Sequence, residues 1–352
     1  MYRLNDIYEN ELISMLARKL PRAPHQINSL HESDAELISL PGSDIILAVT
    51  FDSIVEEIQT GLYRNPYLIG WMMVTVSASD LAAVGAKPIG IMLTETIRPE
   101  SSDEFLNKLQ SGIGKACEKY GLYVLGGDTN ISDKMQMGAT AIGIIADGRY
   151  MTRRGCNCGD LLFASGPLGI GSAFALINQL KKGRGWGKSI EFMPVARLEE
   201  GRILRNYASC CMDTSDGALV TLDQLMRLNN VGFDIEMPLE RILHPKAMKA
   251  AERYSLPLWT FLAGPHGEFE LIFTIPEKYL DEFIMTSKRM KWSPIKMGRV
   301  TNKPEIRIVT GDMKVVLPTG RTRNLFDDVN HDGANYITEL LAIDKQIMAG
   351  KE

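Results

Sequence analysis

The chain has 352 residues, more than one hydrophobic core usually supports, so its length predicts two domains. Apolar residues make up 45% and charged residues 23%, a globular composition that excludes a disordered chain. The formal net charge of −4, without a long run of Lys or Arg, argues against nucleic acid as the main partner.

Three further features narrow the class of protein. Residues 1–16 are polar and acidic and lack the basic flank and apolar core of a secretory signal, so we expect a cytoplasmic protein. The longest apolar stretch, 68–86, contains Asp80 and is therefore not expected to span a membrane. The five cysteines include no C-x-x-C pair, which argues against disulfides and a structural zinc site.

Helical and strand-like patterns alternate along the chain and predict a mixed α/β fold. In the first half, Asn65 and Pro66 are typical of an N-cap and first turn, and Ser101 with Glu104 predicts a capping box for a helix that ends near Gly121. The other elements predicted there are a helix at 5–20 and strands at 44–53, 87–97, 123–129 and 137–147.

A turn at Gly148 and the polar segment after it predict a domain boundary near residue 150. Beyond it, a strand, a turn and a helix follow one another in 160–180, in 210–228 and in 269–283. The basic, glycine-rich stretch 181–189 is expected to be a surface loop, with closure over a ligand as the alternative. The predicted parts are an N-terminal domain at 1–150, a C-terminal domain at 151–320 and a tail at 321–352.

Six aspartates stand at the ends of apolar segments or inside them: Asp34, Asp52, Asp80, Asp128, Asp213 and Asp216. Carboxylates are rarely buried without partners, because each ion loses much of its hydration, so this placement requires a cation or hydrogen-bond donors. Mg²⁺ prefers carboxylate oxygens together with substrate phosphates, so scattered aspartates that meet in space would suit it. The alternative for any one aspartate is a helix cap or a turn residue.

Residues beside these aspartates indicate phosphate chemistry. Gly126 and Gly127 precede Asp128 and would let the backbone approach a phosphate closely. Arg153 and Arg154 would grip nucleotide phosphates through paired hydrogen bonds, or else would be solvated surface charges.

Two glycine-containing turns lead into predicted helices. Ser215 or Asp216 would be the N-cap of the helix that follows, which is compatible with a metal role for Asp216. The turn 166–169 joins a strand to a helix, where exposed amides attract anions, or it is only a tight connection.

The familiar nucleotide-binding motifs are missing from the sequence. It contains no G-x-x-x-x-G-K-[ST], no Rossmann G-x-G-x-x-G and no protein-kinase catalytic loop. The five histidines show no H-x-x-x-H spacing, so a zinc hydrolase is poorly supported. We therefore expect a magnesium-dependent, ATP-using phosphotransferase that relies on dispersed aspartates in place of a P-loop.

Several motifs taken in order resemble the aminoimidazole ribonucleotide (AIR) synthetase-related superfamily, and within it most closely the thiamine-monophosphate kinase branch. The resemblance covers most of residues 30–300. The segments that carry it are VTFDSIVE, IGWMMVTVSASDLAAVGAKP, VLGGDT, TRRGCNCGDLLFASGPLG, MDTSDGALVTL and GPHGEFELIFTIP. It implies a two-domain AIR synthetase-like α/β fold, a dimer built through N-terminal strands, ATP held between the domains, and in-line transfer of the γ-phosphoryl group to a small-molecule phosphate acceptor such as thiamine monophosphate.

The resemblance also implies roles for individual residues of this chain. The positions that match metal-binding aspartates are Asp34, Asp52, Asp80, Asp128 and Asp216. Those that match the nucleotide site are Gly126, Gly127, Thr129, Arg153 and Ser215. Catalysis is expected to depend on Asp128, Asp216 and Arg153, with Mg²⁺ and ATP as the bound groups.

Departures from the kinase pattern gather where the acceptor should bind. Residues 32–35 read E-S-D-A where two adjacent acidic groups are usual, and 55–60 read V-E-E-I-Q-T, without the usual histidine. Met72 stands for a usual lysine and Phe269 for a usual tyrosine. Two alternatives therefore stay open: a related ATP-dependent enzyme with another metabolite or a carboxamide as acceptor, and a nucleotide-binding protein without turnover.

Overall fold

The computed structural model describes residues 7–184, 190–330 and 332–349. The chain forms two compact units, each built from more than one stretch of sequence. The N-unit comprises 22–152 and 193–206, and the C-unit comprises 1–21, 153–192 and 207–352. The expected mixed α/β class is confirmed, because each unit contains one sheet with helices packed on it.

The sheet of the N-unit has five strands in the order β1-β2-β5-β3-β4. β5 lies in its centre and pairs antiparallel with both β2 and β3, whereas β3 and β4 run parallel. The four strands predicted from the sequence are confirmed with shifts of a few residues at their ends. They are β2 (Ile46–Ser53), β3 (Lys87–Ile97), β4 (Tyr123–Ile131) and β5 (Gln136–Ile145), whereas β1 (Glu36–Ser39) was not predicted.

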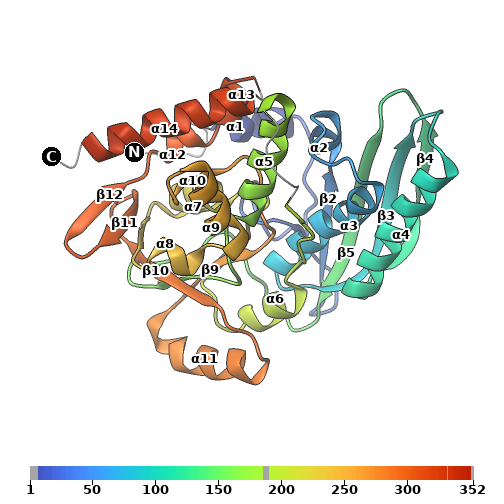
Figure 1. Cartoon of the computed structure of the whole chain (residues 1–352). Helices are drawn as coiled ribbons and strands as arrows, with labels where there is room; N and C mark the ends of the chain where they lie inside the picture. The colour runs from blue at the N-terminus through green and yellow to red at the C-terminus, as the bar shows by residue number, and fades with distance from the viewer. Residues whose placement is uncertain (1–6, 185–189, 331, 350–352) are drawn as a thin grey trace. The chain divides into compact units, whose positions relative to one another are not determined.

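Two long helices cover one face of this sheet (Figure 1). The helices of the N-unit are α2 (Val55–Gln59), α3 (Pro66–Ala83), α4 (Asp103–Tyr120) and α6 (Leu198–Leu204). The Ser77 hydroxyl of α3 donates to the Ala139 carbonyl of β5 at 2.9 Å, which anchors the helix to the central strand. α3 and α4 touch through glycines: a Cβ on Gly70 would lie 2.1 Å from the Leu109 carbonyl oxygen, and one on Gly112 would lie 2.1 Å from that of Tyr67.

Caps explain where these helices begin and end. The Asn65 side chain accepts from the Tyr67 amide, as the sequence predicts. The cap of α4 is Ser102, which accepts from the Phe105 amide, so the predicted capping box at Ser101 is displaced by one residue. Glu104 consequently lies in the first turn and pairs with Lys108 at 2.7 Å instead of closing the box.

The C-unit contains a seven-stranded sheet in the order β12-β11-β8-β10-β6-β9-β7. Its strands are β6 (Leu161–Ala164), β7 (Cys210–Asp213), β8 (Gly232–Ile235), β9 (Leu271–Ile275), β10 (Ile295–Thr301), β11 (Ile306–Thr310) and β12 (Met313–Val316). β6, β7 and β9 are buried along their whole length, so both faces of these strands are covered. The rings of Phe163 and Phe273 stack at 5.7 Å beneath Phe283 of α11 (Leu280–Arg289).

The C-unit has further helical segments, of which those at 170–184 and 218–229 follow the predicted strand–turn–helix order. They are α1 (Tyr8–Ala17), α5 (Ile170–Arg184), α7 (Ala218–Asn229), α8 (Leu239–Ile242), α9 (Pro245–Tyr254), α10 (Thr260–Ala263), the 3₁₀ turn η2 (Glu277–Tyr279), α12 (Thr319–Thr322), α13 (Leu325–Asp328) and α14 (Gly333–Ala349). α14 packs on the core through Tyr336, whose hydroxyl donates to the Ala263 carbonyl at 3.2 Å.

One predicted loop is partly wrong. Residues 181–184 continue α5, and 185–189 lie outside the described residues. Within the described part of the chain, no helix is long and apolar enough to cross a membrane.

Candidate functional site

Two of the predicted metal ligands approach one another within the N-unit. Carboxylate oxygens of Asp34 and Asp80 lie within 4.8 Å of each other. Asp34 precedes β1 in the chain, and Asp80 lies in the last turn of α3, so residues 46 positions apart converge. Two carboxylates this close repel each other when both are ionised, and a bound cation would relieve that repulsion.

Strand β2 supplies the neighbours of this carboxylate pair. The Thr50 hydroxyl donates to the Asp80 carboxylate. Because side chains alternate between the two faces of a strand, Asp52 projects to the same face of β2 as Thr50. Asp34, Asp52 and Asp80 therefore all belong to the α3-covered side of the sheet, where an oxygen-rich metal site is chemically reasonable.

Asp128 lies elsewhere in the N-unit, on edge strand β4. The register aligns Asp128 with Thr94 of β3, Thr94 with Gly138 of β5, and Gly138 with Ser53 of β2. Asp128 is thus three strand spacings, roughly 14 Å, across the sheet from the end of β2. Its carboxylate accepts from the Asn130 amide at 2.6 Å. The N-unit alone does not place Asp128 beside the other three aspartates.

The glycines before Asp128 have a packing role that the sequence did not reveal. A Cβ on Gly127 would lie 2.3 Å from the Leu93 carbonyl oxygen, so only glycine lets β4 pair this closely with β3. Thr129 continues the strand opposite Glu95, and all residues of β4 are exposed. The segment is an edge strand, whose backbone pairs with β3 on one side only.

In the C-unit, Asp213 ends β7 and begins the loop that contains Ser215 and Asp216. The Asp213 carboxylate accepts from the Ser215 amide at 3.4 Å, and the Thr221 hydroxyl donates to the Asp213 carbonyl at 2.8 Å. The N-cap of α7 is Gly217, with φ 93° and no side-chain cap, so the predicted cap at Ser215 or Asp216 is wrong. Asp216 is exposed at the outside of this loop.

Arg153 is held at the start of the C-unit by the end of α7. The Asn229 side-chain amide donates to the Arg153 carbonyl and accepts from the Gly155 amide, both at 2.8 Å. These bonds fix the backbone of 153–155, from which the guanidiniums of Arg153 and Arg154 extend.

Two buried glutamates were missed by the sequence reading. Glu268 and Glu270 precede β9, and Glu268 accepts from the Gly169 amide at 2.7 Å while the Ser165 hydroxyl donates to Glu270. Burial raises the pKa of Glu268 to about 8, and the neighbouring Glu270 carboxylate acts in the same direction. The signal was visible as an E-x-E pattern that enters an apolar strand.

The same glutamates join three glycine loops of the C-unit. The Thr214 hydroxyl accepts from the Glu270 amide at 3.0 Å, and the Thr214 amide donates to the Glu270 carbonyl at 2.8 Å. A Cβ on Gly267 would lie 1.4 Å from the Thr214 carbonyl oxygen, so the loop with Asp216 is packed against 264–267 without room for a side chain. Glu268 and Glu270 thereby fix the backbone that carries Ser215 and Asp216.

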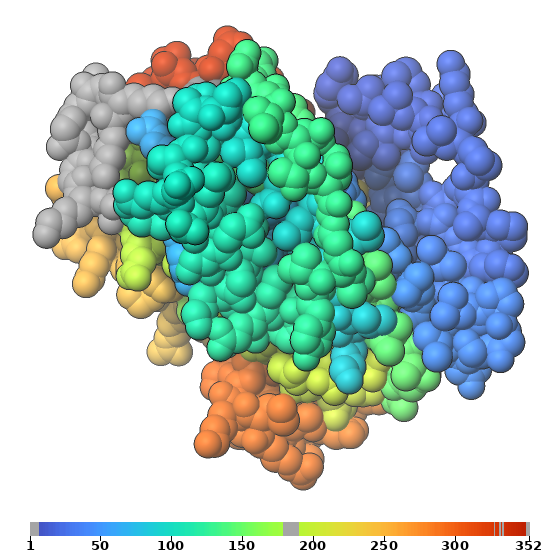
Figure 2. Space-filling model, turned by 90° about the vertical axis from the view of Figure 1, so that its right-hand side faces the viewer, coloured from blue at the N-terminus to red at the C-terminus, as the bar shows by residue number. Residues whose placement is uncertain are grey.

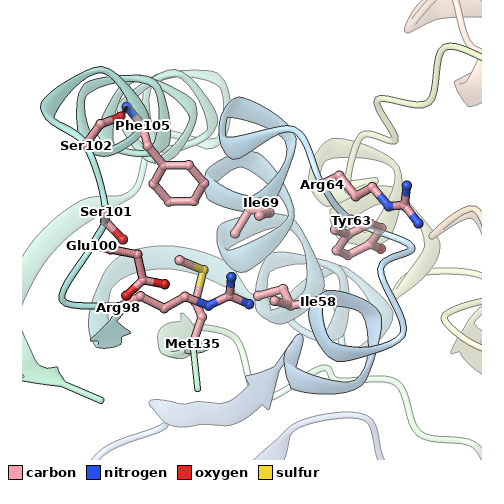
Figure 3. A pocket seen from close by; sticks show the side chains of 10 residues that line it. All are labelled: Ile58, Tyr63, Arg64, Ile69, Arg98, Glu100, Ser101, Ser102, Phe105 and Met135. Atoms are coloured by element: carbon pink, nitrogen blue, oxygen red, sulfur yellow. Dashed lines mark hydrogen bonds between the residues drawn. The ribbon is translucent and has the colours of Figure 1, made fainter. Parts of the chain in front are cut away.

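A pocket of about 410 Å³ opens elsewhere in the N-unit, at the N-terminal end of α4 (Figure 3). It is lined by Ile58, Tyr63, Arg64, Ile69, Arg98, Glu100, Ser101, Ser102, Phe105 and Met135. Apart from Ser101, whose predicted role was a helix cap, these residues were not singled out in the sequence. Their convergence depends on tertiary structure.

Comparison with known proteins identifies the family. Residues 32–145 match the model of the AIR synthase related protein N-terminal domain. The thiamine-monophosphate kinase of Archaeoglobus fulgidus is 30% identical over 273 residues, which cover 76% of this chain and 85% of that protein. The chain belongs to the thiamine-monophosphate kinase family. The motifs from which this resemblance was inferred thus extend over most of both sequences.

Solved structures related to this family member support the fold. AaThiL complexed with AMPPCP and TMP has a TM-score of 0.71 at 21% identity, and covers 89% of this chain and 98% of its own. The hydrogenase maturation protein HypE in complex with ATP has a TM-score of 0.64 at 17% identity, with 91% and 100% covered. At these identities the likeness establishes the shared two-domain fold, which kinases and maturation proteins both use.

Proposed function

We propose that this chain is an ATP-dependent thiamine-monophosphate kinase, which transfers the γ-phosphoryl group of ATP to thiamine monophosphate to form thiamine diphosphate. The observation that carries the proposal is the 30% identity to a thiamine-monophosphate kinase over 85% of that protein. Phosphoryl transfer depends mainly on positioning and on neutralisation of phosphate charge, which carboxylate-bound Mg²⁺ and arginines can provide without a P-loop.

We infer that Mg²⁺ is held in the N-unit by Asp34, Asp52 and Asp80. The proximity of the Asp34 and Asp80 carboxylates and the oxygen-only donor set fit this ion. When bound, Mg²⁺ would neutralise phosphate charge. The Thr50 hydroxyl, by donating to Asp80, would hold that carboxylate in one orientation.

For the remaining predicted residues, we propose the roles that family membership suggests. Asp128 and Asp216 would be further metal ligands, and Arg153 with Ser215 would contact nucleotide phosphates. Gly126, Gly127 and Thr129 would adjoin the nucleotide. Hydrogen bonds within the C-unit support two of these roles, because they fix the backbone from which the side chains extend. Asn229 donates to the Arg153 carbonyl, and Glu270 is bonded to Thr214, the residue before Ser215.

We also propose that the protein is a homodimer. Strand β4 is an unpaired edge whose apolar residues are open on both faces, with Tyr123 74% and Ile131 75% exposed. Atoms of this part of the chain, green-teal in Figure 2, lie at the surface of that view. An exposed apolar edge strand of nine residues is unfavourable in a monomer, and pairing with a second copy would cover it.

A different acceptor is the second candidate. Met72, which stands where the kinase pattern has a lysine, is fully buried in α3 and contributes no charge to a substrate. Gln59 at the end of α2 likewise replaces a histidine expected near the acceptor. These two positions favour a changed acceptor site over a changed ATP site.

The deciding experiment is incubation of the protein with ATP, thiamine monophosphate and Mg²⁺, followed by phosphorus NMR. New diphosphate signals that require both the acceptor and the metal would establish the kinase activity. ADP formation with another phosphorylated metabolite, but none with thiamine monophosphate, would favour the second candidate. Binding of ATP without ADP formation under any acceptor would reject both enzymatic proposals.

A further inference from the structure

None of the residues that line the pocket at the start of α4 has a role in the proposed reaction. Its walls come from α2, the segment before α3, the first turn of α3, the segment 98–102, α4 and the residue before β5. All of these belong to the N-unit, so the pocket is defined within one compact body. A volume of about 410 Å³ is sufficient for a small metabolite.

One side of the pocket is apolar and includes an aromatic ring. The Phe105 ring points from α4 into the pocket beside Ile69 of α3, with Met135 and Ile58 below it (Figure 3). An aromatic face together with a thioether and branched aliphatic groups favours a flat apolar group on the ligand. This apolar wall would bind such a group whether or not the rest of the ligand carries a charge.

Arg98 provides a cation at the same place. Its side chain runs past Glu100 and Met135 toward Ile58, beneath the Phe105 ring (Figure 3). Among the described residues, the Arg98 guanidinium forms no hydrogen bond or ion pair, so its donors remain available. Arg64 differs, because its Nε donates to the Gly61 carbonyl at 2.8 Å and its side chain points away from the other residues.

The start of α4 adds to the positive potential at the pocket. α4 has 18 residues, and its first amides point toward Ser101 and Ser102 in the pocket wall. Helix N-termini favour anions, and the Ser101 hydroxyl can donate a hydrogen bond. Glu100 opposes an anion, so the balance between Arg98 and Glu100 should control affinity.

We propose that this pocket binds a small molecule in which a phosphate or carboxylate is joined to a flat apolar portion. Arg98 contacts the anionic group through paired hydrogen bonds, and Phe105 packs against the flat portion. No residue of this site has a role in the proposed kinase reaction, although Ile58 of its wall adjoins Gln59, the position expected near the acceptor.

Phenyl phosphate is a suitable probe, because it combines the two chemical features in one molecule. Its dissociation constant would be measured by ligand-observed NMR titration of the full chain, with inorganic phosphate as the comparison. Arg98→Ala should weaken phenyl phosphate binding about tenfold, the usual effect of losing a charge-assisted bidentate contact. Glu100→Gln should strengthen binding, since it removes a repelling charge, and Arg149→Ala, at an exposed arginine outside the pocket, should leave it unchanged.

Two results would overturn the site. One is equal affinity of the wild-type protein and Arg98→Ala for phenyl phosphate. The other is equal affinity of the wild-type protein for inorganic phosphate and phenyl phosphate, which would show that the apolar wall contributes nothing. Arg98 is exposed, so its substitution should not unfold the chain, and Arg98→Lys should recover part of the lost affinity by restoring the charge.

Discussion

Glu268 and Glu270 are buried beside one another in the C-unit, where hydrogen bonds to their carboxyl groups offset the loss of hydration. Each glutamate is bonded to a neighbouring loop: the Glu268 carboxylate accepts from the Gly169 amide, and the Glu270 backbone is bonded to Thr214, which precedes Ser215 and Asp216. Burial raises the pKa of Glu268 to about 8. A carboxyl that keeps its proton near neutral pH can remain in an apolar surrounding without a counter-ion.

This raised pKa makes the stability of the C-unit depend on pH. In the unfolded chain Glu268 ionises near pH 4.5, whereas in the folded protein it keeps its proton to about pH 8, so folding becomes less favourable as pH rises between these values. Glu268→Gln keeps an acceptor for Gly169 but does not ionise. Its stability relative to wild type should therefore increase by about 3 to 5 kcal/mol from pH 4.5 to pH 8.

Urea unfolding at pH 5 and at pH 8 would measure this difference. The matched control is Glu240→Gln, an exposed glutamate in the same unit, which should follow the pH dependence of the wild-type protein. An identical pH dependence of Glu268→Gln and wild type would show that Glu268 is ionised in the folded state.

His266 is the buried histidine of the same loop, and it should act in the opposite direction. Burial lowers its pKa to about 4, among the rings of Phe174, Phe192 and Phe269. An unfolded histidine becomes protonated near pH 6.5, so stability is lost as pH falls from there to about 4. His266→Phe should abolish this acid-side loss, which thermal unfolding between pH 4 and pH 7 would detect.

The carboxylates of the N-unit should determine the response to metal. Asp80→Asn and Asp34→Asn each remove a charge from the close pair, and we expect Mg²⁺-dependent turnover to fall about a hundredfold or more. Asp128→Asn and Asp216→Asn should have the same effect if they are ligands. Asp133→Asn, at an exposed turn of the N-unit, is the control that should retain activity. Unchanged rates in all four ligand variants, with the fold intact by circular dichroism, would reject the metal assignment.

At the level of elements, α3 and α4 cross so closely that there is no room for a side chain at two glycine positions. Gly70 and Gly112 each bring the backbone of one helix against a carbonyl of the other. Gly112→Ala should therefore destabilise the protein by about 1 to 3 kcal/mol, because the helices must move apart. Gly114 lies on the same helix with nothing within 4 Å of its added Cβ, so Gly114→Ala should stabilise by up to about 1 kcal/mol through helix propensity.

Thermal unfolding of the two alanine variants side by side tests the crossing. Their opposite signs are expected because the substitutions are identical in helix propensity and differ only in contact with α3. If Gly112→Ala were as stable as Gly114→Ala, the close approach of the helices would not be maintained in solution.

Local sequence signals predicted most elements correctly but placed some ends wrongly. The Asn65 cap was readable because its side chain bonds two residues along the same chain. Ser101 and Ser102 offer the same chemistry, and the direction from which the chain enters α4 selects Ser102. The N-cap of α7 is Gly217, although Ser215 and Asp216 are better capping residues, because this position has a positive φ and lies in close contact with Gly264.

Features that depend on distant partners could not be read from the sequence. Nothing local states that β5 inserts between β2 and β3, or that Gly127 is required by the Leu93 carbonyl. The approach of Asp34 to Asp80 followed from the family resemblance, and their spacing along the chain gave no sign of it. Arg98 went unnoticed because an arginine after a strand is usually a solvated surface residue.

For the molecule as a whole, the exposed edge of β4 leads to a prediction about assembly. Ile131→Asp, at the exposed end of β4, should leave the sheet of one chain intact but place a charge in the proposed contact between chains. We expect sedimentation at micromolar concentration to show a dimer for wild type and a monomer for the variant. Ser132→Asp, just beyond the strand, is the control for added charge. A wild-type monomer would contradict the proposal directly.

The path of the chain between the two units limits how the protein can be dissected. The chain changes unit four times, at 21–22, 152–153, 192–193 and 206–207. A gene fragment that encodes 22–152 alone would lack the segment whose Pro194 carbonyl accepts from Trp71 at 2.7 Å and whose Gly201 packs on Ala82 of α3. That fragment would expose apolar surface on α3 and should aggregate, whereas fusing 193–206 to its end should restore a soluble module. Exchange of either unit between relatives would likewise require recombination at all four of these junctions, so the two units should be inherited together.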